Sequence, residues 1–300
     1  MSHPRLFVIV LSHNHREDTL SCLQSLMQSD YPNFKIILLE HASSADSIKD
    51  YGRQFPRIQI IPLTENLGYA GNNNIGINAA CEQGAEWILL LNNDTVLDAA
   101  CFSRLVEAGE RDPAIGIVGP MVYHFDEPNI IQSAGGVLGK HWQNSHAGSN
   151  EVDRGQFKSV RTVDWVSGCA MMIRPALINE IGAFDEEYFL YWEETELCIR
   201  ASRAGWKIVQ VPEAKLWHKG VQRNYQPKPY VTYYSTRNYL FTLFKHKAPF
   251  SVRMLAVVGI LRTLLSWSVK PAWRNKREHR DAMWRGLQDF FFRRMGPMIA

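Results

Sequence analysis

The residues whose types and spacing best suit chemistry lie in one acidic and aromatic stretch, residues 184–200. Carboxylates are interleaved there with Phe, Tyr and Trp before the pattern turns helical. Burying a carboxylate costs free energy unless it is paired or coordinated, so acids among large aromatic side chains indicate a lined pocket that holds an ionisable group. The alternative is a solvated helix start, where the helix dipole suits Glu193, Glu194 and Glu196. The stretch alone leaves both interpretations open.

A second chemical group follows an apolar run, residues 87–91, which is typical of a buried strand. The run leads directly into Asn92, Asn93, Asp94 and Thr95. A carboxylate at the carboxyl tip of a central strand is well placed to hold a divalent cation against the phosphates of a ligand. A turn Asp that caps the next helix is the structural alternative.

A third segment, residues 66–76, contains three glycines and four asparagines and is expected to precede a helix that runs to about residue 84. Glycine lets a backbone approach closely, and the N–H groups at a helix start favour phosphate. An ordinary loop with a helix cap is the simpler interpretation.

The irregular, Gly-rich segment 122–160 carries His124, His141 and His146. It is expected to form a mobile loop over a site. The spacing of the three histidines matches no zinc pattern, so they are interpreted as solvated loop residues.

Short apolar runs and helical spacings define the expected elements. Strands are predicted at residues 6–11, 35–39, 58–62, 87–91, 115–120, 163–173 and 206–211, and helices at 18–27, 48–55, 97–108, 176–181 and up to about residue 204. Successive strand–helix units predict an α/β fold with a right-handed, doubly wound and mostly parallel sheet flanked by helices. Ligands bind such sheets at the carboxyl ends of the strands, where the polar turns 12–15 and 40–46 fall.

Composition limits the class of protein. A length of 300 residues suits one large domain with or without an appendage. Five cysteines without a C-x-x-C pair argue against a disulfide framework or a zinc site and favour a reducing compartment. The apolar run near the N-terminus is too short for a signal peptide. Since no apolar run reaches about 18 residues, we expect no ordinary membrane span.

The C-terminal part of the chain is basic. It contains 13 Lys and Arg against 3 Asp and Glu after Tyr230, whereas the rest of the chain contains 20 against 27. Residues 230–244 are expected to be helical, and the apolar residues 251–269 are interrupted by Arg253 and Arg262. Basic residues interleaved with Trp and Phe favour a helix that lies in an anionic membrane surface. The alternative is a helical hairpin packed on the body or on a second subunit, and no motif indicates nucleic acid.

Taken in their order along the chain, these motifs resemble those of the family 2 glycosyltransferases with the GT-A fold, and within them a rhamnosyltransferase-like branch. The similarity covers roughly residues 6–220. It rests on SHN after the first strand, then on NLGYAGNNNIG, LLNNDT, WVSGCAMMIRP, FDEEYFLYWEETELCIRASRAGW and VPEAKLWHKG. The resemblance implies a GT-A catalytic domain over residues 1–225, with a nucleotide-sugar half to about residue 120 and an acceptor half over 121–225. A basic, aromatic helical extension follows over residues 226–300.

The resemblance also implies the roles of individual residues. Glu194 stands where the family has its catalytic Asp, and Asp94 and His218 stand where a Mg²⁺ or Mn²⁺ ion meets the donor diphosphate. The residues implied to bind the nucleotide sugar are Ser12, Asn14, Glu40, Asp46, Asn66, Gly68, Asn73 and Asn93. Those implied to line the pocket for the acceptor and the transferred sugar are Gly168, Trp192, Glu193 and Arg200. The sequence departs from the family pattern at Glu194, which is one methylene longer than Asp, at Glu40-His41 in place of Asp-Asn, and at Asn92 in the first acidic position of the metal motif. Arg237 and Asn238 match an Arg-Asn pair that similar enzymes often carry.

The expected chemistry fits these residue types. A carboxylate can take the proton of an acceptor hydroxyl as the hydroxyl attacks the anomeric carbon, and a cation stabilises the leaving diphosphate. We therefore expect an inverting, metal-dependent transfer of a sugar, with a deoxysugar such as rhamnose as the first choice. The donor is expected to be dTDP- or UDP-linked, and the acceptor to be a cell-surface glycan or a polyprenyl-linked glycan.

The expected location is cytoplasmic, peripheral on the inner face of the cell membrane, and the oligomeric state is open. Three alternatives remain at this point. They are a UDP-sugar transferase of the same fold, a catalytically inactive nucleotide-sugar binding module, and a nucleotidyltransferase-like enzyme. The last would need a basic, Gly-rich loop after the first strand, where the sequence has Ser12, His13 and Asn14.

Overall fold

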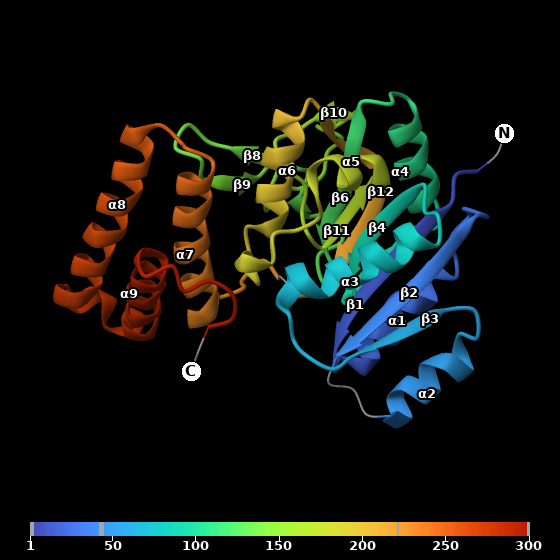
Figure 1. Ribbon diagram of the computed structural model, residues 1–300, viewed down its shortest axis with the longest axis horizontal. Coiled ribbons are helices and arrows are strands. Elements are labelled where there is room, and N and C mark those ends of the chain that lie inside the picture. Colours follow the sequence, from blue (N-terminus) through green and yellow to red (C-terminus); the bar gives the residue numbers. More distant parts are fainter. Residues whose placement is uncertain (1–2, 42–44, 221, 299–300) are drawn as a thin grey trace.

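A ten-stranded sheet forms the centre of the computed structural model, which describes residues 3–41, 45–220 and 222–298 (Figure 1). The strand order is β10-β12-β6-β11-β4-β1-β2-β3, with β5 paired to β12 and β7 paired to β6. The strands of this sheet are β1 Leu6–His13, β2 Phe34–His41, β3 Gln59–Leu63, β4 Trp87–Asn92, β5 Thr95–Leu97, β6 Ile115–His124, β7 Ile131–Ser133, β10 Arg161–Thr162, β11 Ala170–Ile173 and β12 Lys207–His218. A separate small sheet joins β8 Gly136–Leu138 and β9 Asn144–His146.

Helices cover both faces of the sheet and continue as a group beside it (Figure 1). The helices of the body are α1 Arg16–Leu26, α2 Ala45–Gln54, α3 Gly68–Glu82, α4 Cys101–Glu110, α5 Pro175–Ile181 and α6 Glu193–Arg203, and the short 3₁₀ turn η1 Glu186–Tyr188 precedes α6. The C-terminal helices are α7 Pro229–Lys245, α8 Phe250–Val269 and α9 Arg277–Phe291, with the 3₁₀ turn η2 Pro271–Lys276 between the last two.

Strand β1 shows why the central strands are apolar throughout. Leu6, Val8 and Val10 pack into the core on the side of α1 and α4. Phe7 and Ile9 pack into the core on the opposite side, with α3, α5 and α6. A strand that is buried on both faces has no polar alternation. The predicted α/β fold, with a doubly wound and mostly parallel sheet flanked by helices, is confirmed.

Parallel pairing brings the polar strand ends to one edge of the sheet. Strand β1 pairs in parallel with both β2 and β4, in a register that aligns Ser12 with Glu40 and Leu11 with Asn92. The ends of three strands that lie far apart in the sequence therefore meet where ligands bind in such sheets.

The Gly- and Asn-rich segment corrects the sequence prediction. It is not a loop before a helix, because α3 already begins at Gly68 and includes the three consecutive asparagines. Asn72 and Asn73 are buried, and a Cβ at Gly76 would lie 2.6 Å from the side chain of Ile9. Close packing of α3 on the sheet thus overrides the weak helix propensity of Asn and Gly.

Other boundaries differ as well. The predicted strand 163–173 is a strand only over its last four residues, and β12 continues to His218 instead of ending at residue 211. The segment 122–160, expected to be an irregular loop, contains β7, β8 and β9. Its strands form because their edges pair with β6 and with each other.

The C-terminal helices pack side by side next to the body (Figure 1). Leu240 of α7, Leu264 of α8 and Leu287 of α9 meet in their centre. In the described part of the chain, α8 is the one helix long and apolar enough to cross a membrane by length and composition. The sequence criterion predicted none, because Arg253 and Arg262 interrupt its apolar run.

Candidate active site

A cavity of about 930 Å³ lies between the body and α7. Six of the residues predicted to serve catalysis, metal binding or the sugar pocket line it, namely Asp94, Gly168, Trp192, Glu193, Glu194 and His218. Asp94 follows β4 and Glu194 begins α6, so the fold brings these distant carboxylates to one cavity.

Asp94 and His218 form a pair on the cavity wall. Oδ1 of Asp94 lies 3.2 Å from Nε2 of His218, and Nδ1 of His218 lies 2.9 Å from Oε1 of Gln132. Because a glutamine Oε1 only accepts hydrogen bonds, Nδ1 carries a proton. Burial alone would raise the pKa of Asp94, but the hydrogen bond and the charge of His218 outweigh it and lower that pKa.

This pair fits a divalent cation. A bound cation would take the place of the proton between the two side chains, and the 3.2 Å between Nε2 of His218 and Oδ1 of Asp94 suits adjacent ligands of a cation at about 2.1 Å. A Cβ at Gly220 would lie 2.2 Å from Oδ2 of Asp94, so only glycine leaves that oxygen room. The described residues contain no cluster of three His, Cys, Asp or Glu side chains suited to a metal. A cation here would therefore need oxygens from water or from a ligand's phosphates as well.

Glu193 and Glu194 begin α6 with their carboxylates in the cavity wall. In the described part of the protein, Oε2 of each is buried without a hydrogen-bond partner. Burial raises the pKa of Glu194 to about 7. Burial and then the charge of Glu194 raise the pKa of Glu193 well above its usual value. A buried carboxyl group that titrates near neutral pH in a cavity is suited to proton transfer.

Tyr69 and Gly168 complete the wall beside Glu194. The Tyr69 hydroxyl donates to the Gly168 carbonyl oxygen, and a Cβ at Gly168 would lie 3.8 Å from Cβ of Glu194. Burial raises the pKa of the neighbouring Cys169 thiol to about 12, which keeps it an unreactive neutral group. Sequence analysis did not single out Tyr69, although it stands inside the NLGYAGNNNIG motif.

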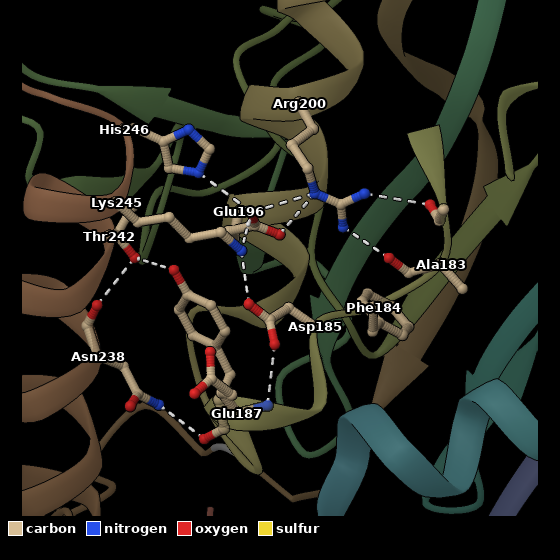
Figure 2. A network of polar contacts seen from close by, with 12 residues as sticks. Ala183, Phe184, Asp185, Glu187, Glu196, Arg200, Asn238, Thr242, Lys245 and His246 are labelled. Atoms are coloured by element: carbon tan, nitrogen blue, oxygen red, sulfur yellow. Dashed lines mark hydrogen bonds and ion pairs between the residues drawn. The ribbon is translucent and has the colours of Figure 1, made fainter. Parts of the chain in front are cut away.

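Arg200 was expected in the sugar pocket, but it does not line the cavity. Its Nε donates to both oxygens of Glu196, at 3.1 and 2.9 Å, and its Nη atoms donate to the carbonyl oxygens of residues 181–183 (Figure 2). Lys245 and His246 of the C-terminal extension also contact Glu196, at 2.7 and 3.1 Å. Arg200 therefore joins α6 to the end of α5, and the described lining of the cavity does not include it.

Two of the residues predicted to contact the nucleotide form hydrogen bonds with a neighbouring protein side chain instead. Ser12 Oγ lies 2.8 Å from Oγ1 of Thr19, and Asn93 Nδ2 donates to the same hydroxyl at 2.9 Å. This buried cluster fastens the ends of β1 and β4 to α1. The described lining of the cavity includes neither Ser12 nor Asn93.

The predicted contacts from the Gly- and Asn-rich segment also serve its packing. Asn66 Oδ1 accepts from the Gly68 N–H at 2.9 Å, and Asn73 Nδ2 donates to the Tyr69 carbonyl oxygen at 2.9 Å. A Cβ at Gly68 would lie 2.2 Å from the carbonyl oxygen of Phe189. Gly68 is thus required by the close approach of another backbone, which a sequence motif alone does not distinguish from the approach of a phosphate.

The other three predicted nucleotide contacts lie near the carboxyl ends of β1 and β2. Glu40 is buried at the end of β2, and Asn14 follows β1 with a positive φ of 54°. Asp46 is in the first turn of α2 with its side chain 95% exposed, and residues 42–44 before it lie outside the described residues. The described residues that line the cavity include none of the three.

Sequence analysis missed the wall formed by the segment 122–160. His124, Asn144 and His146 line the cavity together with Trp165. His124 is buried in β6, and Nδ1 of His146 lies 2.9 Å from the Ser133 hydroxyl. The interpretation as a solvated loop residue is wrong for His124, which is buried in a strand. His146 belongs to β9 and lines the cavity but remains exposed, and His141 lies in the turn between β8 and β9.

Residues 7–180 match the model of the family described as glycosyl transferase family 2. The chain belongs to that family. The predicted membership and the predicted class of enzyme, an inverting glycosyltransferase, are confirmed.

Two relatives and one solved structure illustrate the similarity. This glycosyltransferase is 26% identical over 244 residues to N-acetylglucosaminyl-diphospho-decaprenol L-rhamnosyltransferase of Mycobacterium tuberculosis, across 75% of this chain and 79% of the relative. It is 23% identical over 271 residues to dTDP-rhamnosyl transferase RfbF of Shigella flexneri, across 87% of each chain. Its fold matches mannosyltransferase PcManGT from Pyrobaculum calidifontis, solved with GDP-Man and Mn²⁺, with a TM-score of 0.60, 12% identity and coverage of 98% and 88%.

Family membership decides among the alternatives. A nucleotidyltransferase-like enzyme is excluded, and an inactive binding module is not favoured because the cavity retains Asp94 and Glu194. The likeness to the mannosyltransferase shows that this glycosyltransferase has the GT-A fold.

Proposed function

We propose that this glycosyltransferase moves a deoxysugar, with L-rhamnose as the first choice, from a dTDP-linked donor to a hydroxyl of a lipid-linked or cell-surface glycan. One observation carries the proposal, namely that the Asp94–His218 pair and the Glu193–Glu194 pair line the same cavity. The names of the two bacterial relatives, one for a decaprenol-linked acceptor and L-rhamnosyl transfer and one for dTDP-rhamnosyl transfer, support the choice of donor and acceptor.

Glu194 acts as the base of the reaction. Its carboxylate accepts the proton of the acceptor hydroxyl while the hydroxyl oxygen forms a bond to the anomeric carbon. The bond between that carbon and the donor phosphate breaks on the opposite face, so the configuration inverts and the nucleoside diphosphate leaves. Burial and the charge of Glu194 raise the pKa of Glu193 as well, which favours a protonated carboxyl group that can donate a hydrogen bond within the site.

Asp94 and His218 would hold a divalent cation, Mg²⁺ or Mn²⁺, whose charge stabilises the departing diphosphate. The 3.2 Å between Oδ1 of Asp94 and Nε2 of His218 and the Mn²⁺ in the similar mannosyltransferase support the assignment. The nucleoside would lie along the carboxyl ends of β1 and β2, near Asn14 and Glu40. Trp192, which lines the cavity next to Glu193, would contact a sugar ring.

A donor screen tests the proposal. The protein is mixed with dTDP-rhamnose, with UDP-sugars and with GDP-sugars, each with and without Mn²⁺, and the melting temperature is measured. We expect dTDP-rhamnose to raise the melting temperature in a metal-dependent way, and Asp94→Ala to remove the dependence on metal while Glu213→Ala, on the exposed face of β12, keeps it. Stabilisation by UDP-sugars alone would favour the UDP-sugar transferase instead.

The C-terminal extension docks on the inner, anionic face of the cell membrane. One face of α8 packs on α7 and α9 through Val252 and Leu264. Its other face exposes Phe250, Met254, Leu255, Val258, Leu261, Leu265 and Val269 at helical spacing. Exposed basic residues surround this apolar stripe, as in helices that lie in an anionic membrane interface, and they include Lys247, Arg262, Lys270 and Arg274.

A position in the membrane–water interface fits α8 better than a position across the membrane. A spanning α8 would carry its packed neighbour α9 toward the hydrocarbon, with Asp281, Arg285 and Asp289, at a high cost in free energy. The active-site cavity also reaches Ile260 of α8 and Met283 of α9. The cavity would therefore lie close to the membrane surface that carries a lipid-linked acceptor.

Vesicle sedimentation tests the docking surface. We expect the protein to bind vesicles that contain an anionic lipid, to bind neutral vesicles weakly, and to be released by high salt. Val258→Asp/Leu261→Asp should abolish binding, whereas Val137→Asp/Val152→Asp on the body, with similarly exposed apolar side chains, should not. Resistance to high salt and to alkaline extraction would show a spanning helix instead.

A further inference from the structure

The segment of residues 188–192, which joins η1 to α6, has an unusual backbone. Phe189, Tyr191 and Trp192 have φ angles of 63°, 66° and 78°. Residues other than glycine adopt positive φ only at a cost in free energy, and they keep it where the surrounding structure imposes it. Glu193 follows directly, so this segment sets where α6 begins and where its first two carboxylates lie.

Asn238 of α7 holds this segment from the side of the C-terminal extension. Its Nδ2 donates to the carbonyl oxygens of Tyr188, Leu190 and Tyr191, at 2.9, 2.9 and 2.8 Å. The side chain is fully buried, and Figure 2 shows its amide pointing from α7 toward the segment. An amide nitrogen has two hydrogens, so three converging carbonyl groups use its whole capacity to donate.

Arg237 orients this amide. Its Nε donates to Oδ1 of Asn238 at 2.9 Å, which turns Nδ2 toward the segment. The guanidinium is fully buried and also donates to the carbonyl oxygens of Tyr188 at 3.1 Å and Gly296 at 2.7 Å. A buried guanidinium is tolerated when its N–H groups are satisfied, and here the segment and the C-terminal residues satisfy them.

The opposite side of the segment rests on α3. A Cβ at Gly68 would meet both the carbonyl oxygen and the ring of Phe189, and the Ala70 N–H donates to that carbonyl oxygen at 3.4 Å. The segment is therefore gripped between the start of α3 and the middle of α7.

We propose that Asn238 is a positioning residue for sugar transfer, because it holds residues 188–191 in the backbone conformation that directs Glu194 into the cavity. The inference rests on the proposed function, since it takes Glu194 as the base. Asn238 acts through the segment, and the described lining of the cavity does not include it. The C-terminal extension is thus part of the support of the active site as well as a docking element.

The pH profile of kcat tests this role in the full-length protein. Asn238→Leu keeps the volume of the side chain but removes its donors. A misplaced catalytic group costs about a hundredfold in rate, so we expect kcat to fall about a hundredfold. The midpoint of the acidic limb should also move down from about pH 7 toward the value of an ordinary carboxyl group, because a loosened segment admits water to Glu194.

The titratable groups that face Glu194 are the same in wild type and in every variant. The midpoint of the acidic limb can therefore be compared between them. They are Glu193 of α6, Tyr69 of α3, and the thiols of Cys169 and Cys198. Asn238→Ser keeps one donor and should fall between wild type and Asn238→Leu in both rate and midpoint. If the leucine variant does not fold, the kcat and the midpoint of Asn238→Ser test the proposal instead.

Tyr188→Phe is the matched control. It removes the buried bond between the Tyr188 hydroxyl and Thr242 of α7, at 2.9 Å, but leaves the three carbonyl bonds of Asn238. We expect it to lower the melting temperature without moving the midpoint. If Asn238→Leu and Asn238→Ser behave like Tyr188→Phe, Asn238 only attaches α7 to the body and the inference is overturned.

Glu194→Gln separates this inference from the proposed function. If Glu194→Gln abolishes transfer while the Asn238 variants keep the wild-type rate and midpoint, only the positioning role fails. If Glu194→Gln retains turnover, the proposed base is wrong and both fail.

Discussion

Two glutamates of helix α6, two positions apart, have opposite surroundings. Glu194 is half-buried in the cavity wall, its buried Oε2 lacks a hydrogen-bond partner in the described structure, and burial of the carboxyl group raises its pKa to about 7. Glu196 is buried on another side of the helix. Burial alone would raise its pKa as well, but His246, Arg200 and Lys245 outweigh burial and lower it to about 2 (Figure 2).

The difference shows what separates a reactive carboxylate from a structural one. Burial is common to both, so burial alone indicates neither. The Glu196 carboxylate contacts the cationic Arg200 and Lys245 and accepts from His246 Nε2, and it therefore remains ionised, which stabilises the fold. The Glu194 carboxylate is uncompensated and therefore exchanges its proton near neutral pH, which suits catalysis.

The largest effect expected from this comparison is on turnover. Glu194→Gln removes the proton acceptor and should lower kcat by about 10²–10⁴-fold. Because glutamine is neutral, it avoids the burial of a charge, and the free energy of unfolding at pH 8 should not fall. Steady-state kinetics and urea unfolding check both parts. A variant that unfolds more easily than wild type would show that Glu194 is structural after all.

Glu196→Gln should act in the opposite way, on stability first. The Gln side chain leaves the cationic Arg200 and Lys245 without their shared carboxylate, so the free energy of unfolding at pH 7 should fall by about 3 kcal/mol. Because the folded-state pKa of Glu196 lies below the usual value, its contribution is complete above about pH 4.5 and is lost as the pH falls toward about 2. Urea unfolding across this range should show that loss in wild type and in the surface control Glu213→Gln, but not in Glu196→Gln.

The pH dependence of turnover sharpens the contrast. Only the carboxylate form of Glu194 accepts a proton, so kcat should fall about tenfold per pH unit below pH 7 and level off above it. Glu196 remains ionised throughout this range and should contribute nothing to the limb. Rates measured from pH 5 to pH 9 with saturating substrates check this. A midpoint near pH 4.5 would mean that Glu194 is not shielded from water.

The smallest effect expected is at the edge of the Glu196 cluster. Asp185 contacts Lys245 at 2.5 Å, but both side chains are partly exposed. Asp185→Asn keeps an acceptor for the Glu187 N–H that Asp185 now caps and removes only the charge. The free energy of unfolding should fall by less than about 1 kcal/mol. A loss as large as that of Glu196→Gln would mean that the network depends on its exposed member.

The sequence predicted best where a pattern is repeated locally. The apolar run in β1 predicted burial on both faces, and the order of strands and helices predicted the doubly wound sheet. The spacing of Glu196 and Arg200, four residues apart, is that of a helical ion pair, and it was a usable sign that Arg200 has a structural partner. The sequence predicted the end of α3 but not its start at Gly68, because packing on the sheet outweighs the weak helix propensity of its Asn and Gly residues.

Other features depend on contacts between residues far apart in the sequence. The Arg237-Asn238 pair stood out only by resemblance, because its partners lie about 50 positions away in the segment before α6. The line of His124, Asn144 and His146 on the cavity wall depends on the pairing of short strands that carry little apolar pattern. Asp94 and Glu194 were found because each follows or begins an element with a recognisable pattern.

Contacts near the end of the described chain hold a stretch that is synthesised much earlier. The Gly296 N–H donates to the carbonyl oxygen of Glu187 at 2.9 Å, and its own carbonyl group receives the Arg237 guanidinium. A ribosome adds about 5–20 residues per second, so Glu194 is added to the chain roughly 5–20 seconds before Gly296. During that interval the growing chain lacks the last contacts that hold this stretch, so we expect the stretch to reach its final conformation only after Gly296 has been added.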